Sequence, residues 1–324
     1  MKSFESNLAA QLNAYIRYRV GQGCSEKSIR APLVIFDKYL TETGCQEHPI
    51  QPAFLLKMRN ALKQDPKTVN NLLSALRGFF LFLVRQEIYD HSPVEDIPAL
   101  PVRVYVPFVF SPDQIELLLQ AASRSVRKTK AHLLRDMATY LVVVLLARCG
   151  MRLREPLRLR IEHYRPGEGT LYIEKTKFSK DRLIPVPKRA LQEIENYLAA
   201  RQALLADDSN PYLLAGLYQS HLPVARVTQF FHEAAKAIGI EKQEHVLADV
   251  VFGSVRPHAL RHSFAINTMK RIREQGKDPQ HALPVLAAYL GHREYKYTAA
   301  YLKVLDQENR QGLVDFAKSR QDRV

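Results

Sequence analysis

Apolar residues in the first hundred positions recur at the spacing of amphipathic helices. Ser25 is suited to cap a helix that runs to about Glu42. Asp65 followed by Pro66 predicts another N-cap, with proline at the first helical position. The helix after it carries a broad apolar face, formed by Val69, Leu72, Leu73, Leu76, Phe79, Phe80, Phe82 and Leu83. We expect about four helices in this region and no strand of note.

A proline-rich stretch separates this region from the rest of the chain. Prolines at positions 93, 98, 101 and 107 remove backbone donors, and each disfavours helix in the residue before it. Ser111-Pro112-Asp113 then predicts the start of a new helix. We therefore place the domain boundary near residue 105, with a helical N-terminal domain over 1–105 and a second domain over 106–324.

The second domain is predicted to be mainly helical with a small β insertion. Alternating or β-branched residues over 171–175 and 182–186 flank the polar Thr176–Asp181, which predicts a β-hairpin. The apolar run from Tyr140 to Ala147 predicts a buried helix and is too short to span a membrane. Further helices are expected over about 189–205, 226–238, 257–275, 283–290, 295–303 and 306–319.

The composition is that of a folded globular protein with an uneven positive charge. Hydrophobic residues make up 46% of the chain and aromatic residues 9%, which excludes a disordered protein. The formal net charge is +14. Residues 1–105 hold 13 Lys and Arg against 10 Asp and Glu, whereas residues 106–324 hold 34 against 23. This balance favours a polyanionic partner such as nucleic acid, and most of the positive excess belongs to the second domain.

Cysteine usage and the N-terminus indicate the compartment. Cys24, Cys45 and Cys149 are too few and too scattered for a disulfide framework or a zinc site. The first residues contain no apolar signal region. We therefore expect a cytoplasmic, nucleoid-associated protein without membrane contact.

Two short segments supply cationic side chains suited to a phosphate. His258 and Arg261 are three residues apart in a helix that Pro257 opens, so both lie on one face near its N-terminus, where the helix dipole favours anions. Arg152 follows the buried helix, and Glu155 is placed to orient Arg152, or a neighbouring histidine, by a charge-assisted hydrogen bond. Either pair alone is also typical of a solvated surface. Other arginines compete with Arg152 by position, namely Arg154, Arg158 and Arg160.

The predicted hairpin tip carries Lys175, Lys177 and Lys180. A flexible loop can bring an ammonium group beside a leaving oxygen, where it serves as a general acid. A solvated basic turn has the same composition, and position alone does not choose among the three lysines.

Tyr301 lies nine residues after His292 in a tyrosine-rich stretch. Tyrosine is a weak nucleophile at neutral pH because its free pKa is roughly 10. A site that uses it must stabilise the phenolate or accept its proton, as flanking cations do. Tyr295 and Tyr297 are near neighbours, and most tyrosines in any protein serve packing.

The order of these segments resembles the tyrosine recombinase (phage integrase) family. Gly-Met-Arg152-Leu-Arg-Glu155 is similar to the first arginine box of that family. His258-Ala-Leu-Arg261-His-Ser-Phe is similar to the second box. Lys177, on a hairpin followed by Asp-Arg-Leu-Ile-Pro, is similar to its mobile lysine.

The third box is Leu290-Gly-His292, with Tyr301 nine residues later. The resemblance covers about residues 106–305 in detail. It implies that residues 1–105 form the helical, core-binding domain that clamps DNA, so that the two domains make a C-shaped clamp. It also implies a catalytic domain over 106–324, which includes a C-terminal tail.

The resemblance implies a site-specific DNA recombinase with the following chemistry. Tyr301 attacks a phosphodiester and forms a 3′-phosphotyrosyl bond, while Arg152 and Arg261 neutralise the nonbridging oxygens. His258 takes the proton of the nucleophile or shares in stabilising those oxygens. The remaining roles are a hydrogen bond to the phosphate from His292, protonation of the 5′-hydroxyl leaving group by Lys177 and orientation by Glu155. No metal and no cofactor is expected, since arginines supply the charge and the phosphotyrosine stores the bond energy.

The implied partner is double-stranded DNA. Recombination joins two duplexes, so the resemblance implies a homo-tetramer on paired sites, and an accessory DNA-bending or directionality protein is a further candidate partner. Residues 306–324, with an apolar patch at Leu313, Val314 and Phe316, are suited to dock on a neighbouring subunit or to pack on their own domain.

Several activities share this chemistry. The interval from Arg261 to His292 is longer than in compact members, with an extended helix and loop expected around Arg271–Leu283, and this favours the recombinase of a mobile element over a chromosome-dimer resolvase. A relaxing, type IB-like topoisomerase is an alternative, as is a relative that binds DNA without cutting it. The complete set of residues speaks against the silent relative.

Overall fold

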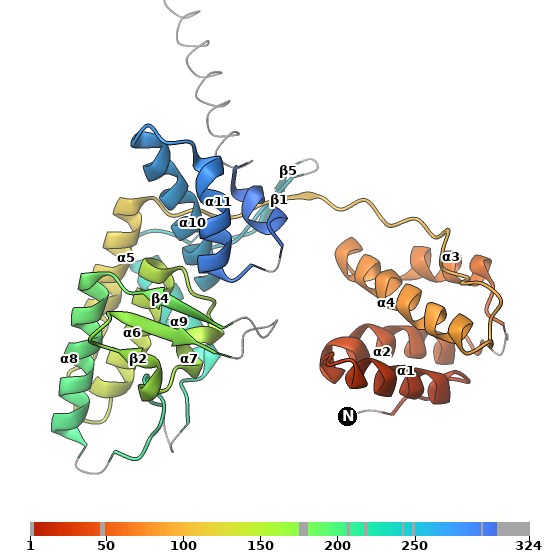
Figure 1. The fold of residues 1–324 in the computed structure, drawn as a ribbon, viewed down its shortest axis with the longest axis horizontal. Helices are drawn as coiled ribbons and strands as arrows, with labels where there is room; N and C mark the ends of the chain where they lie inside the picture. Colours follow the sequence, from red (N-terminus) through yellow and green to blue (C-terminus); the bar gives the residue numbers. More distant parts are fainter. Residues whose placement is uncertain are drawn as a thin grey trace, which may run out of the picture. The chain divides into compact units, whose positions relative to one another are not determined.

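The chain folds into two compact units, Met1–Arg103 and Val104–Val324, which we describe separately. The computed structural model describes residues 3–45, 49–174, 181–205, 208–216, 220–241, 243–247, 250–292 and 294–302. Helices dominate the described residues of both units, with short strands in the second (Figure 1). None of the described helices is long and apolar enough to cross a membrane.

The first unit is helical, as predicted. Its described helices are α1 (Ala9–Gly21), α2 (Glu26–Glu42), α3 (Pro52–Ala61) and α4 (Pro66–Arg85). The start of α4 follows the sequence signal, because the Asp65 carboxylate accepts a 2.8 Å hydrogen bond from the Lys67 N–H.

An aromatic cluster forms the centre of the first unit. Phe36 of α2 packs on Phe79 and Phe80 of α4, with ring centroids 6.4 and 6.1 Å apart. All three side chains are fully buried. The apolar face predicted for α4 is therefore the face that binds α2.

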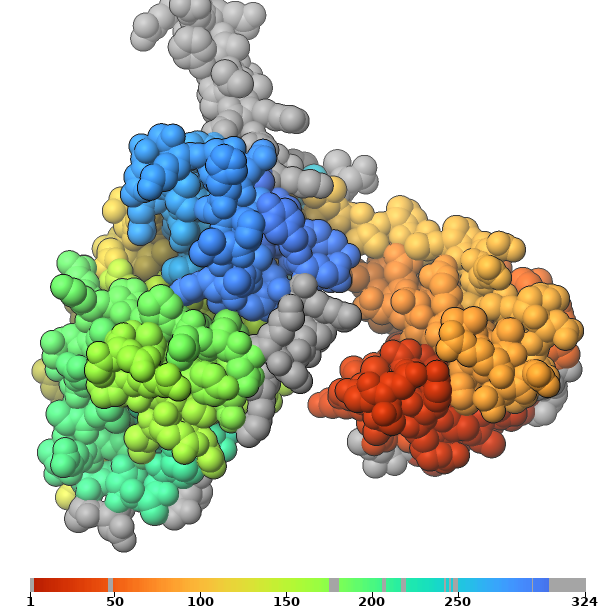
Figure 2. Space-filling view, in the orientation of Figure 1, coloured from red at the N-terminus to blue at the C-terminus, as the bar shows by residue number. Residues whose placement is uncertain are grey.

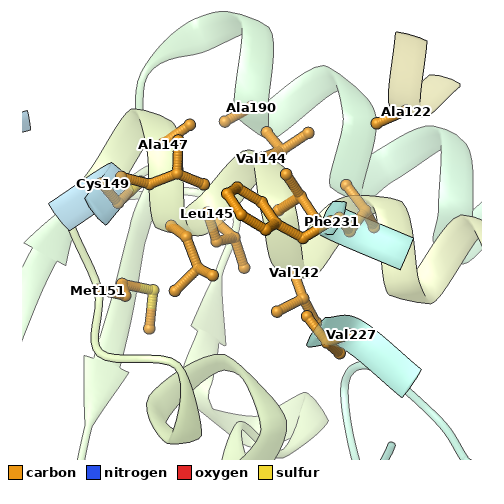
Figure 3. Packing of buried hydrophobic residues seen from close by; sticks show 14 of the residues in the cluster. Ala122, Val142, Val144, Leu145, Ala147, Cys149, Met151, Ala190, Val227 and Phe231 are labelled. Atoms are coloured by element: carbon orange, nitrogen blue, oxygen red, sulfur yellow. The ribbon is translucent and has the colours of Figure 1, made fainter. Parts of the chain in front are cut away.

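The second unit is built around one buried helix. Its described helices include α5 (Pro112–Arg124), α6 (Leu133–Cys149), α7 (Arg154–Arg158), α8 (Lys188–Leu204), α9 (Val224–Ala237), α10 (Pro257–Glu274) and α11 (Pro279–Leu290). Helix α6 packs against α5, α8, α9 and α10. Its side chains lie among Ala190 of α8 and Val227 and Phe231 of α9 (Figure 3). Neighbours on all sides explain why every residue from Leu141 to Ala147 of α6 is apolar and buried.

Two small sheets complete the second unit. Strands β3 (Thr170–Ile173) and β4 (Arg182–Pro185) are the two arms of the predicted hairpin, and β2 (Tyr164–Arg165) joins them in an antiparallel sheet. The hairpin tip, residues 175–180, lies outside the described residues. The other sheet was not predicted: β1 (Val104–Val106) pairs in parallel with β6 (Val250–Phe252), which pairs antiparallel with β5 (His245–Leu247). Strands of three residues are too short to show a period in sequence.

Helix α11 begins earlier than the pattern predicted. We expected its start at about residue 283, but it begins at Pro279. The Asp278 carboxylate caps it by accepting a 2.8 Å hydrogen bond from the Gln280 N–H, as Asp65 does for α4. The Asp-Pro signal was therefore present and overlooked. Residues 296–302 are helical, within the expected 295–303. The expected helix 306–319 lies outside the described residues.

Candidate active site

The first arginine box forms an ion-pair cluster in which Glu155 is largely buried and Arg152 is partly exposed. Arg152 Nη1 donates to Glu155 Oε1 at 2.9 Å, and the Arg152 N–H donates to Oε2 at 2.8 Å. The second partner of Glu155 is Arg182 of β4, whose Nη2 lies 2.9 Å from Oε2. Burial raises the pKa of Glu155, but its hydrogen bond to Arg182 and the charges of both arginines outweigh this and hold the pKa below its ordinary value. The carboxylate therefore stays ionised and fixes both guanidinium groups.

Arg182 is a site residue that the sequence analysis missed. Its side chain is 8% exposed. Nε donates to the carbonyl of Tyr289 at 2.8 Å, while Nη1 is buried and has no hydrogen-bond partner among the described residues. A buried unpaired donor costs free energy unless a ligand satisfies it. Arg182 thus ties the end of the lysine-bearing hairpin to helix α11 and to Glu155.

Arg261 lies deeper than the other arginines, with 1% exposure. Its Nη1 donates to the carbonyl of Gly150 at 2.8 Å and its Nη2 to that of Leu290 at 2.6 Å. These carbonyls end α6 and α11, where the helix dipole is negative. Burial, followed by repulsion from Arg152, lowers the pKa of Arg261 to about 10, so the guanidinium remains charged at neutral pH.

Two glycines make these close approaches geometrically feasible. Gly150 and Gly291 end their helices in the left-handed conformation, with φ of 57° and 64°. A Cβ on Gly150 would lie 2.4 Å from Cδ1 of Phe264, and one on Gly291 would lie 3.0 Å from Nη1 of Arg182. Arg152 Nη2 also donates to the Gly291 carbonyl, at 2.6 Å. Gly150 of the first box and Gly291 of the third box therefore allow the ends of their helices to lie close to the guanidinium groups.

Three histidines lie beside the arginines. His258 and His262 stack edge-on in α10, with ring centroids 4.7 Å apart. His292, just after α11, pairs through Nδ1 with Thr298 Oγ1 at 2.7 Å. Burial and the neighbouring cations lower the pKa of all three, to about 3 for His262 and about 4 for His292. All three rings are therefore neutral at pH 7.

Tyr301 is the tyrosine that joins this cluster. Its side chain is 6% exposed, whereas Tyr295 and Tyr297 are 49% and 52% exposed. Its hydroxyl oxygen lies 3.0 Å from Nδ1 of His262, and its ring centroid lies 6.2 Å from that of His292. Burial raises the pKa of Tyr301, although Arg261 and Arg152 act in the opposite direction. The free site therefore holds a neutral phenol.

The structure thus brings together six of the predicted residues, namely Arg152, Glu155, His258, Arg261, His292 and Tyr301. The surface of α10 and α11, in blue, adjoins that of β2–β4 and α8, in green (Figure 2). Lys177 and its rivals Lys175 and Lys180 lie outside the described residues. Besides Arg182, His262 is a second residue of this cluster that was not predicted, although its spacing of four from His258 could have indicated it.

Metal-ligating side chains do not gather in the described part of the chain, where no group of three or more His, Cys, Asp or Glu residues could hold an ion. The polar groups of the site are instead mainly cationic donors. Such a set suits a phosphate rather than a metal.

Comparison with known proteins places this arrangement in a family. The chain is 27% identical over 301 residues to the putative integrase/recombinase y4rB of Sinorhizobium fredii, covering 92% of this chain and 93% of that protein. It is 29% identical over 257 residues to the tyrosine recombinase XerC of Alcanivorax borkumensis, covering 79% and 75% of the two chains.

Solved structures share the fold. The XerH site-specific recombinase bound to difH substrate matches with a TM-score of 0.68 and 17% identity, over 95% of this chain and 97% of that one. A lambda integrase dimer bound to a COC′ core site matches with a TM-score of 0.61 and 18% identity, over 91% and 76%. Residues 109–308 match the family model described as the phage integrase family. The chain therefore belongs to the phage integrase family, the tyrosine recombinases.

Proposed function

We propose that Tyr301 is the nucleophile with which this protein cuts and rejoins double-stranded DNA. As a tyrosine recombinase, the protein is a site-specific DNA strand transferase that works through a covalent tyrosine intermediate. The observation that carries the assignment is the burial of the Tyr301 hydroxyl beside His262, His292 and Arg261, in contrast to the exposed Tyr295 and Tyr297. In the forward step Oη attacks phosphorus, a 3′-phosphotyrosyl bond forms and the 5′ oxygen leaves.

Arg152 and Arg261 are proposed to bind the nonbridging oxygens of the scissile phosphate. Both guanidinium groups are held in place before DNA arrives, Arg152 by Glu155 and Gly291, Arg261 by two helix-end carbonyls. Fixed donors of this kind stabilise a developing charge without reorganising during the reaction. Arginines can therefore supply the charge, and we propose a reaction that requires neither metal nor cofactor.

The remaining roles concern protons and the phosphate. We assign His292 to a hydrogen bond with the phosphate and His258 to the proton of the nucleophile or to the same oxygens. Lys177 is proposed as the general acid for the 5′ oxygen, with Lys175 and Lys180 as alternatives. The Glu155 carboxylate orients Arg152 and Arg182.

A groove next to His258 supports DNA as the partner. It is lined by the cationic Lys236 of α9 and Arg256 at the start of α10, by the imidazole of His232, and by Glu241 and Glu244. We propose that the DNA backbone passes here on its way to the arginines. We further propose that residues 1–105 bind the duplex as a core-binding domain.

The wider biological role is also a proposal. We propose a homo-tetramer on paired DNA sites, aided by a DNA-bending or directionality protein, in which residues 306–324 dock between subunits. Its setting would be the integration, excision or resolution of a mobile element in the cytoplasm. The preference for a mobile element rests on the long interval between Arg261 and His292. Helix α11 occupies part of this interval, since it begins at Pro279. Dimer resolution of a chromosome remains the alternative setting.

A covalent-adduct assay tests the proposed nucleophile. Nicked duplexes tiled across the DNA that flanks the coding sequence are incubated with the protein in EDTA, and covalent complexes are separated on denaturing gels. We expect an adduct with wild type and with Tyr297→Phe, and none with Tyr301→Phe. An adduct with Tyr301→Phe would reassign the nucleophile, and DNA binding without any adduct would indicate the silent relative. Relaxation of plasmids that lack a cleaved site would indicate the topoisomerase.

A further inference from the structure

His262 has the position of a catalytic base. Its Nδ1 lies 3.0 Å from the Tyr301 hydroxyl oxygen, the distance expected between a nucleophile and its base. The proposed function assigned His258 either to this proton or to the phosphate oxygens, but the ring within hydrogen-bond distance of the hydroxyl is that of His262, one helical turn further along α10. We infer that His262 is a further catalytic residue, which accepts the hydrogen bond of the Tyr301 hydroxyl and takes its proton during attack on phosphorus.

The surroundings of His262 hold the ring in place. The His258 ring packs on it edge-on at 86°, and the Tyr301 ring lies on another side, with centroids 5.7 Å apart. Helix α10 continues for three turns beyond His262, anchored by the buried Ala265, Ile266 and Met269. A base fixed in this way keeps the phenol in one orientation toward the arginines. His258 is then left with the second of its two assigned roles, stabilisation of the phosphate oxygens.

The proton balance of the step is complete. The Oη–P bond forms and the P–O5′ bond breaks, while the phenolic proton moves to Nδ1 of His262 and leaves an imidazolium. The 5′ oxygen takes a proton from the general acid, which the proposed function assigns to Lys177. In the reverse step the incoming 5′-hydroxyl returns its proton to that acid, and His262 gives its proton back to Oη. The inference rests on the proposed function, since it names the base of that reaction.

The free site does not transfer this proton by itself. Burial and the charges of its neighbours lower the pKa of His262 to about 3, while burial raises that of Tyr301. The groups that face the ring are His258 and Arg261 on α10, His292 after α11 and Tyr301 on the last described helix. A bound phosphate would offset the cations among them and make His262 more basic. The attack would therefore be enabled by the substrate that Arg261 binds.

The test is single-turnover cleavage of the nicked duplexes by His262→Asn. An asparagine side chain keeps a hydrogen-bonding atom near the position of Nδ1 but cannot take a proton. We expect a loss of about 100-fold or more at pH 7 that narrows as the pH rises, because hydroxide then removes the phenolic proton. The matched control is His132→Asn, since His132 forms the same type of contact, 3.0 Å from Nδ1 to Thr129 Oγ1, away from the site. We expect wild-type rates from the control.

A DNA substrate with sulfur in place of the leaving 5′ oxygen distinguishes the loss of a base from the loss of the general acid. When the leaving 5′ oxygen is replaced by sulfur, no general acid is needed, so Lys177→Ala should be rescued while His262→Asn remains slow. A His262→Asn rate within twofold of wild type, a loss equal at every pH, or full rescue by sulfur would each overturn the assignment. Circular dichroism shows whether His262→Asn folds. If it does not, cleavage by His262→Ala is measured with and without added imidazole. Faster cleavage with imidazole supports His262 as the base, and an unchanged rate rejects it. If wild type itself forms no adduct, the proposed function fails instead.

Discussion

The guanidinium of Arg182 and the carboxylate of Glu155 are both buried and lie 2.9 Å apart, with side-chain exposures of 8% and 10%. Because Glu155 also accepts a hydrogen bond from Arg152, the pair connects strand β4 to Arg152. It lies at the base of the hairpin whose tip carries the proposed general acid. Stability of the fold and geometry of the site therefore depend on the same contact.

Removal of Arg182 should destabilise the protein strongly. Arg182→Ala leaves Glu155 with one cation in place of two and leaves the Tyr289 carbonyl without its donor. We expect a loss of about 3 kcal/mol in the free energy of unfolding. Urea denaturation followed by circular dichroism measures it. Arg189→Ala is the matched control, because that side chain is 83% exposed and lies 3.9 Å from Glu116. Equal losses from the two substitutions would show that the buried pair is unimportant.

Glu155 should contribute stability that depends on pH. Its pKa in the folded protein is below the ordinary value of 4.5, so the stabilising contribution is present above pH 4.5 and is lost as the pH falls through the folded value. Glu155→Gln should therefore be less stable than wild type at pH 7, and the difference should shrink below pH 4.5. Unfolding free energies measured between pH 3 and 7 test this. A difference that stays constant over that range would contradict the prediction.

Gly150→Ala should destabilise the second unit more than an equivalent change elsewhere. The new Cβ would meet the Phe264 ring at 2.4 Å and would sit at a φ of 57°. Gly239→Ala is the control, since Gly239 has a φ of 72° with no atom within 4 Å of a Cβ. We expect about 1 kcal/mol for the control, from the left-handed backbone alone. Thermal unfolding should show a clearly larger loss for Gly150→Ala, and similar losses would mean that Phe264 moves aside without cost.

Thr298→Val should slow DNA cleavage without weakening DNA binding. Thr298 is fully buried, and its hydroxyl pairs with Nδ1 of His292 at 2.7 Å. Valine keeps the volume but frees the ring to rotate, so we expect a loss of about tenfold in the single-turnover rate. Thr129→Val serves as the control, because Thr129 is exposed and its hydroxyl forms the same type of pair, 3.0 Å from Nδ1 of His132. A change in binding of the same size as the change in rate would argue against an orienting role.

Local patterns in the sequence predicted most of the helices and the hairpin of the second unit. Helix α4 begins where Asp65 and Pro66 indicate, and its apolar face is the face that packs on α2. These features follow from contacts within a few residues, which repeat with the period of the backbone. The hydrophobic pattern did not reveal β1 and β6, because these strands have only three residues each. The start of α11 was placed too late because the Asp278-Pro279 signal was overlooked.

The sequence by itself determined the order of the chemical groups, and this order was enough to indicate the family. Only the tertiary structure decided which of several similar side chains meet. Arg152 reaches the carbonyl of Gly291, 139 residues away, while Arg154 points to solvent. Tyr301 is buried against His262, while Tyr297 is half exposed. Contacts between distant segments leave no period in the chain, because they arise from the packing of α6, α10 and α11. For that reason Arg182 and His262 became visible only in the fold.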